Sequence, residues 1–194
     1  MNRAYKFRIY PDKKQRILFA KTFGCVRFIY NQMLSDKISF YRETGKSLPI
    51  TPAKYKEQYE WLKEVDSLAL ANAQLNLQSA YKNFFSKKHS GFPKFKSKKK
   101  SRKKYTTNNQ HDSIRIENGK IKLPKAGYVK IVLHRPIIGI IKSATIEQTP
   151  TDKYFVSILV ECENQVPEVN LQKFICIRSH TSLRGTTTQY VLKH

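Results

Sequence analysis

The sequence predicts an α+β protein, in which a small antiparallel β-barrel carries an α-helical insertion after its first strand and ends in an irregular C-terminal tail. Apolar and polar residues alternate over residues 3–10 and again from 113 to 163, whereas apolar residues recur every three or four positions between 12 and about 85. A period of two is typical of half-buried strands, and a period near 3.6 is typical of amphipathic helices. The first strand must therefore pair with strands that lie far away in sequence.

The helical stretch is expected to begin at Pro11-Asp12, because a proline and a capping aspartate suit a helix start. Gly24 predicts a break that gives two helices, and Gly45 is a plausible C-cap. A short helix is then expected up to Trp61, and a longer one over 68–85. Two apolar stripes are interpreted as core: Phe19, Phe23, Val26, Tyr30, Met33 and Tyr41 in the first part, and Leu68, Leu75, Leu77, Tyr81 and Phe84 in the last.

A basic segment follows the helices. Residues 87–104 hold ten Lys or Arg residues in 18 positions and no acidic one. A run of this kind is often an arm for nucleic acid. It contains Gly91-Phe92-Pro93-Lys94-Phe95-Lys96, whose two aromatics indicate that the segment is not simply disordered.

The remaining strands begin with a hairpin over 114–123, where Asn118-Gly119 suits a tight turn. Further strands are expected at 129–134, 142–148 and 153–163, which makes about six with the first one. The predicted domains are a barrel of residues 1–10 and 105–163, a helical recognition insertion of 11–104 with its basic segment at 86–104, and a linker and tail over 164–194.

The net charge points to the class of partner. Lys and Arg number 37 against 14 Asp and Glu, a formal charge of +23. A compact protein with this charge repels itself unless a polyanion neutralises it, so nucleic acid is the expected partner. No basic amphipathic helix or long apolar run indicates a membrane, and no motif indicates a small-molecule substrate. The three cysteines form no CxxC pair, which favours a reducing cytoplasm and no zinc.

The candidate nucleic-acid-binding residues are mainly cations on the helices, the basic segment and the strands. Arg27 and Asn31 share a helix face, and they either contact a phosphate or a base edge or form an intramolecular helix–helix hydrogen bond. Phe92 and Phe95 either stack on unpaired bases or pin the basic segment to the core, and the proline between them favours a fixed turn. The full set is Arg27, Asn31, Lys87, Lys88, Phe92, Lys94, Phe95, Lys96, Arg102, Lys103, Lys104, Arg115, Lys122 and Arg135.

No catalytic set is recognisable, and the sequence predicts no metal site and no cofactor. The nearest group of carboxylates is Glu57, Glu60, Glu64 and Asp66, which is interpreted as a solvated helix surface with lysines at pairing distance. The five histidines show no metal-ligand spacing, and there is no phosphate-binding glycine loop.

Several motifs together resemble one family. The strand and helices, Gly24-x-x-Arg27-x-x-Tyr30-Asn31, Tyr81-x-x-Phe84-Phe85, the sequence of residues 91–96 and the β region after it, with 121–125, 128–130 and 154–157, resemble TnpB, also called OrfB. The resemblance covers about residues 1–163. It implies an insertion-sequence protein, described historically as a transposase, from a family of RNA-guided DNA endonucleases.

The resemblance also implies a division of labour. The family's front lobe is a β-barrel "wedge" with an inserted recognition domain, whose first helices are often called a helix-turn-helix. It grips the guide RNA, the guide–target duplex and the motif that flanks the target. A RuvC-like nuclease domain in the C-terminal half cuts DNA with Mg²⁺.

The sequence departs from the family after the last predicted strand. Where the family has Gly-Ile-Asp-Leu-Gly, with the first catalytic aspartate, this chain has Cys176 and Arg178 at the Gly and Asp positions. We therefore expect the front part of a truncated, catalytically inactive TnpB-like protein, and a frameshift near residue 175 would explain the aperiodic tail. Two alternatives stay open: a regulator that represses transposition or transcription, and a relic without function.

Overall fold

The computed structural model describes residues 1–86 and 91–162. Strand β1 (Asn2–Tyr10) leads into α1 (Lys13–Thr44), α2 (Pro52–Gln58), the 3₁₀ helix η1 (Glu60–Glu64) and α3 (Ser67–Ser86). Six strands follow: β2 (Lys103–Asn108), β3 (Arg115–Glu117), β4 (Lys120–Leu123), β5 (Gly127–Val132), β6 (Ile140–Gln148) and β7 (Tyr154–Glu161). The fold class is α+β, as the sequence predicts.

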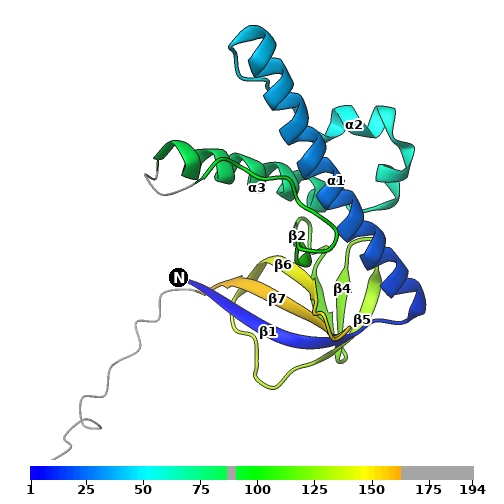
Figure 1. Cartoon of the computed structure of the whole chain (residues 1–194). Coiled ribbons are helices and arrows are strands. Elements are labelled where there is room, and N and C mark those ends of the chain that lie inside the picture. Colours follow the sequence, from blue (N-terminus) through cyan, green and yellow to red (C-terminus); the bar gives the residue numbers. More distant parts are fainter. Residues whose placement is uncertain (87–90, 163–194) are drawn as a thin grey trace, which may run out of the picture. The chain divides into compact units, whose positions relative to one another are not determined.

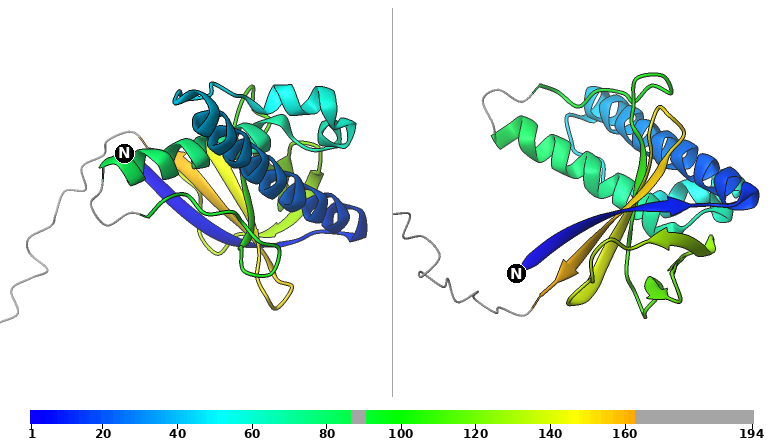
Figure 2. Two further views of the ribbon diagram at one scale, coloured as in Figure 1. Left: turned by 45° about the horizontal axis from the view of Figure 1, so that its top comes forward. Right: turned by 90° about the horizontal axis from the view of Figure 1, so that it is seen from below.

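The seven strands form one antiparallel sheet in the order β2-β6-β7-β1-β5-β4-β3. The sheet curls into a half-barrel (Figures 1 and 2), whose outermost strands are β2 and β3. Strand β1 lies between β7 and β5, with Phe7 opposite Val156 and Ile9 opposite Ile131. The expected long-range pairing of the first strand is therefore confirmed, but the sheet is open where the sequence pattern predicts a barrel.

Helix α1 is continuous, so the predicted break at Gly24 is wrong. Asp12 and Gln15 form a reciprocal capping box at its start, and Gly45 ends it in the left-handed conformation at φ 69°. Those two caps agree with the sequence pattern. Gly24 costs helix propensity without breaking the helix, because the apolar stripe on either side stays packed: Phe23, Cys25 and Val26 are all buried.

The core joins the first half of α1 to strands β2 and β7 of the sheet. Phe19 is fully buried and lies 6.2 Å from the ring of Tyr105 on β2 and 6.0 Å from that of Tyr154 on β7. Two residues assigned to the core by spacing are instead exposed: Tyr41 by 63% and Leu75 by 51%. The helices continue past the residues that they bury, and on α3 the buried positions are Ala69, Leu70, Ala73 and Leu77.

Strand β2 is not predicted by the sequence pattern, because it lies at the end of the basic segment. Its outward residues are polar or charged, yet Tyr105 and Thr107 alternate inward and are buried. Thr107 donates a hydrogen bond to Asp66 at the start of α3. Strand β2 contacts both α1 and α3, and so it connects the helices to the sheet.

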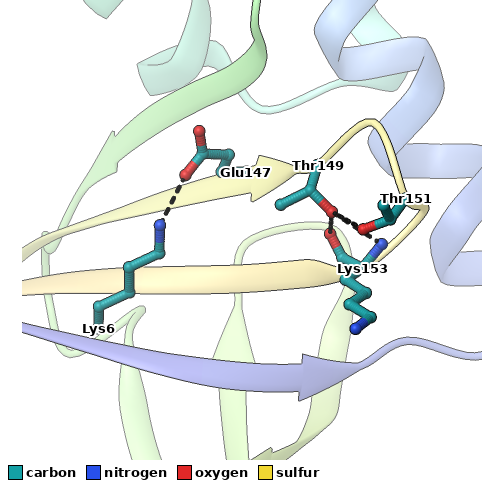
Figure 3. Close-up of polar contacts among 5 residues, drawn as sticks. All are labelled: Lys6, Glu147, Thr149, Thr151 and Lys153. Atoms are coloured by element: carbon teal, nitrogen blue, oxygen red, sulfur yellow. Dashed lines mark hydrogen bonds and ion pairs between the residues drawn. The ribbon is translucent and has the colours of Figure 1, made fainter.

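The turns follow the sequence signals closely. In the β3–β4 hairpin Asn118 and Gly119 have φ of 48° and 70°, as a tight Asn-Gly turn requires. Figure 3 shows the β6–β7 turn, where the Thr149 hydroxyl lies 3.1 Å from the backbone nitrogen of Lys153 and 3.0 Å from the Thr151 hydroxyl. In the same view Lys6 on β1 reaches across β7 to Glu147 on β6 at 3.0 Å.

Candidate nucleic-acid interface

A groove lies between α1, α3 and the connecting segment, residues 91–102, which leads into β2. It encloses a cavity of about 330 Å³. None of the described residues that line it is acidic, and we call it the basic groove. Five cations line it: Arg27 from α1, Lys96 and Arg102 from the connecting segment, and Lys103 and Lys104 from β2. The fold thus gathers five of the predicted site residues, which come from three separate stretches of sequence.

Asn31 holds the connecting segment in place. Its side-chain nitrogen donates to the Lys96 carbonyl at 2.9 Å, and its side-chain oxygen accepts from the Lys96 amide at 2.8 Å. Asn31 therefore satisfies both backbone groups of Lys96 in the manner of a neighbouring strand. Bidentate reading of an adenine edge with the same edge of this amide would require both hydrogen bonds to break.

The Lys96 side chain lies against the wall of the basic groove. Its ammonium is 3.7 Å from the centroid of the buried Tyr30 ring, a close cation–π contact. Burial, and to a smaller extent the nearby charge of Lys104, lowers the pKa of Lys96 from its ordinary value of 10.5. Both effects disfavour the charged form, and an anion in the groove would favour it.

The two phenylalanines of the basic segment differ in their surroundings. Phe92 makes edge contacts with the rings of Tyr81 at 5.7 Å and Phe84 at 5.4 Å, so it pins the segment to α3. It stays 45% exposed. Phe95 is 58% exposed, and it makes no aromatic ring contact among the described residues. Lys94, between them, is also exposed.

The three predicted residues of the later β region, two on strands and Arg135 between β5 and β6, do not line the basic groove. Arg115 and Lys122 are direct cross-strand partners on β3 and β4. Arg115 forms an exposed ion pair with Glu117 at 2.7 Å and donates to the Tyr128 hydroxyl at 3.1 Å. The guanidinium of Arg135 lies over the Tyr5 ring at 4.9 Å. These cations therefore lie apart from the five that converge.

Some predictions fall outside the described residues: Lys87 and Lys88, the positions of Cys176 and Arg178, and the whole tail over 164–194. Of the carboxylates assigned to a helix surface, Glu64 pairs with Lys21 at 2.6 Å and Glu60 with Lys63 at 3.7 Å. Nowhere in residues 1–86 and 91–162 do three or more His, Cys, Asp or Glu side chains gather as a metal-binding group. None of the helices described there is long and apolar enough to cross a bilayer.

The groove lining includes two asparagines that are absent from the set predicted from the sequence. Asn72 and Asn76 lie one turn apart on α3 and line the basic groove, where Asn76 is exposed. Their i,i+4 spacing places both amides on one face of α3, beside the buried Ala69 and Ala73. That spacing is a sequence signal from which their position next to the helix–helix contact could have been predicted. Nothing in the sequence indicates that β2 lies opposite them.

The comparison with known proteins identifies the family. Residues 1–46 match the model of the OrfB/IS605-type helix-turn-helix domain. The chain is 34% identical over 173 residues to a "Putative RNA-guided DNA endonuclease" of Streptomyces pristinaespiralis. It is 29% identical over 179 residues to the "Putative RNA-guided DNA endonuclease InsQ" of Escherichia coli K12. The chain belongs to the TnpB/OrfB family.

These TnpB/OrfB relatives are longer than the matched region. The two alignments cover 83% and 84% of this chain but 42% of each relative, so the chain spans less than half of their length. A third relative, "Virulence protein VsdF" of Salmonella dublin, is 38% identical over 115 residues, which are 50% of this chain and 95% of that protein. Within the TnpB/OrfB helix-turn-helix match, the structure has β1 and the unbroken helix α1.

Proposed function

We propose that this chain binds nucleic acid and that the basic groove holds the sugar–phosphate backbone. The observation that carries the proposal is the convergence of Arg27, Lys96, Arg102, Lys103 and Lys104 on one groove without an acidic neighbour in its described lining. Like charges at close range destabilise a folded protein, and phosphates neutralise them while releasing condensed counterions. Contacts of this kind fix the position of a nucleic acid without reading its sequence.

Membership of the TnpB/OrfB family supports a more specific assignment. Two relatives carry names that describe RNA-guided DNA cleavage, and such a protein must hold a guide-type RNA or the guide–target duplex. We assign that role in this chain to the helices and the basic groove, as an inserted recognition part, and a supporting, wedge-like role to the curled sheet.

The groove assignment is tested by removing three exposed cations together, Arg102→Gln, Lys103→Gln and Lys104→Gln. We expect fluorescence anisotropy at fixed salt to show weaker binding of both structured RNA and duplex DNA, because phosphate contacts do not depend on sequence. The matched control neutralises exposed lysines away from the groove: Lys13→Gln, Lys14→Gln and Lys54→Gln. Equal affinities of the two triple variants would contradict the assignment.

We further propose that this chain binds but does not cut DNA. The support is the sequence at Arg178, where the family has a catalytic aspartate. An arginine cannot serve as a ligand for Mg²⁺, and its charge repels the ion. The test is incubation of the purified chain with guide RNA, matching DNA and Mg²⁺, in which we expect intact DNA. Guide-dependent cleavage by this preparation would refute the proposal.

A further inference from the structure

A second, separate cavity lies between the later parts of α1 and α3. These helix segments extend past the sheet (Figure 1) and enclose about 680 Å³. Aromatic rings dominate one wall. Tyr81 stacks on Phe85 at 6.3 Å, Phe84 meets Phe85 at 5.1 Å, and both Tyr81 and Phe84 contact Phe92 by their edges. Tyr41 lines the cavity from α1. We call this cavity the aromatic pocket.

Three of the five rings that line the aromatic pocket are exposed to solvent. Phe85 is 78% exposed, Tyr41 is 63% exposed and Phe92 is 45% exposed. Exposed apolar side chains that cluster around a cavity mark a binding surface more often than single ones do. The apolar spacing on α1 and α3 predicts core positions that are in fact exposed. A ligand that covers the rings of the aromatic pocket explains part of this exposure.

The charges around the aromatic pocket decide between possible ligands. Lys37 and Arg42 line it, and none of the described lining residues is acidic. The Lys37 ammonium donates to the Leu48 carbonyl at 2.7 Å, which fixes the cation at the pocket. A second copy of this chain would bring another +23 charge against these cations. A ligand with flat π-faces and a negative backbone suits both the rings and the charges.

We propose that the aromatic pocket stacks the unpaired bases of a single-stranded nucleic-acid segment, whose phosphates lie near Lys37 and Arg42. This inference rests on the proposed function, because it takes the same class of ligand, but it uses a different surface and a different chemistry. The two surfaces are adjacent in the chain: Phe92 lines the aromatic pocket and Lys96 lines the basic groove. One strand can therefore leave the groove and place its bases in the pocket.

The test uses the full chain and a single-stranded oligonucleotide that contains 2-aminopurine, whose fluorescence falls when the base stacks. A strand of equal length with abasic sites keeps the phosphates and removes the bases. The wild-type protein should quench the fluorescence and bind the abasic strand more weakly. The double variant Tyr41→Ala/Phe85→Ala should lose the quenching and bind the intact strand about 5- to 150-fold more weakly for each stack that is lost.

The matched control is Trp61→Ala, which removes an aromatic side chain, 42% exposed, that does not line the pocket. It should leave the quenching unchanged, and duplex affinity should be the same in all three proteins. Equal binding of intact and abasic strands by the wild type, with duplex binding retained, overturns the pocket alone. If the wild-type protein binds neither single strands nor duplexes, both proposals are overturned. Self-association that sedimentation detects in the wild type but not in the double variant would assign the pocket to a second copy.

Discussion

At the scale of single residues, two glycines have opposite surroundings, and replacing each with alanine should change stability in opposite directions. A Cβ at Gly139 (φ +113°) would lie 2.4 Å from the Glu161 carbonyl oxygen, whereas a Cβ at Gly24 would meet no atom within 4 Å. Gly139→Ala should lower the free energy of unfolding by about 2–4 kcal/mol, because strain and a backbone clash add. Gly24→Ala should raise it by about 0.5–1 kcal/mol. Urea denaturation measures both, and changes of the same sign would show that the two glycines do not differ in this way.

Lys96 gives a pH-dependent prediction at the same scale. Its folded-state pKa is lowered by burial. Between that lowered pKa and 10.5 the unfolded chain holds a proton that the folded chain has released, so this group makes the free energy of unfolding rise with pH in that range. Below the lowered pKa the destabilising effect of its buried charge is fully present. A phosphate in the basic groove should raise the pKa again. Binding near the lowered pKa should therefore take up protons.

Calorimetric titrations in buffers of different ionisation enthalpy measure this uptake. Lys96→Arg is the control, because arginine keeps its charge across this pH range. The uptake should disappear in the variant. An undiminished uptake in Lys96→Arg would assign the proton to another group.

At the scale of structural elements, the connecting segment depends on the two hydrogen bonds between Asn31 and Lys96. Asn31→Ala removes both and leaves two part-buried backbone groups without a protein partner, so stability should fall by about 1–3 kcal/mol. The amide of Lys96 should exchange faster with solvent, and nucleic-acid affinity should fall although no charge has changed. Asn83→Ala, at an exposed position on α3, is the control. If exchange at Lys96 stays slow, the segment is held by other contacts.

The elements also show how far sequence reasoning reaches. Local signals predict the Asp12 cap, the Gly45 cap and the Asn118-Gly119 turn, because each depends on a few adjacent residues. Strand β2 escapes such reasoning, since its two lysines and three polar residues conceal the inward Tyr105. The basic groove can be anticipated as a set of cations but not as a place. Its position depends on β2 meeting α1 and α3, a long-range contact that no local pattern contains.

At the scale of the whole molecule, the central claim is that charge is concentrated where a nucleic acid lies. The formal charge of +23 belongs to the entire chain, and a uniformly basic surface would also bind a polyanion. What distinguishes the basic groove is geometry: cations from α1, the connecting segment and β2 line one cavity. The loss of groove cations should therefore affect binding more than the loss of the same number elsewhere.

The salt dependence of binding tests this claim most directly. Each phosphate contact on duplex DNA contributes about 0.9 to the slope of log affinity against log salt. The variant Arg102→Gln/Lys103→Gln/Lys104→Gln should reduce the magnitude of that slope by roughly 2–3, and the variant Lys13→Gln/Lys14→Gln/Lys54→Gln should leave it nearly unchanged. Equal slopes for the two triple variants would show that the charge acts diffusely, and the basic groove would then lose its assigned role.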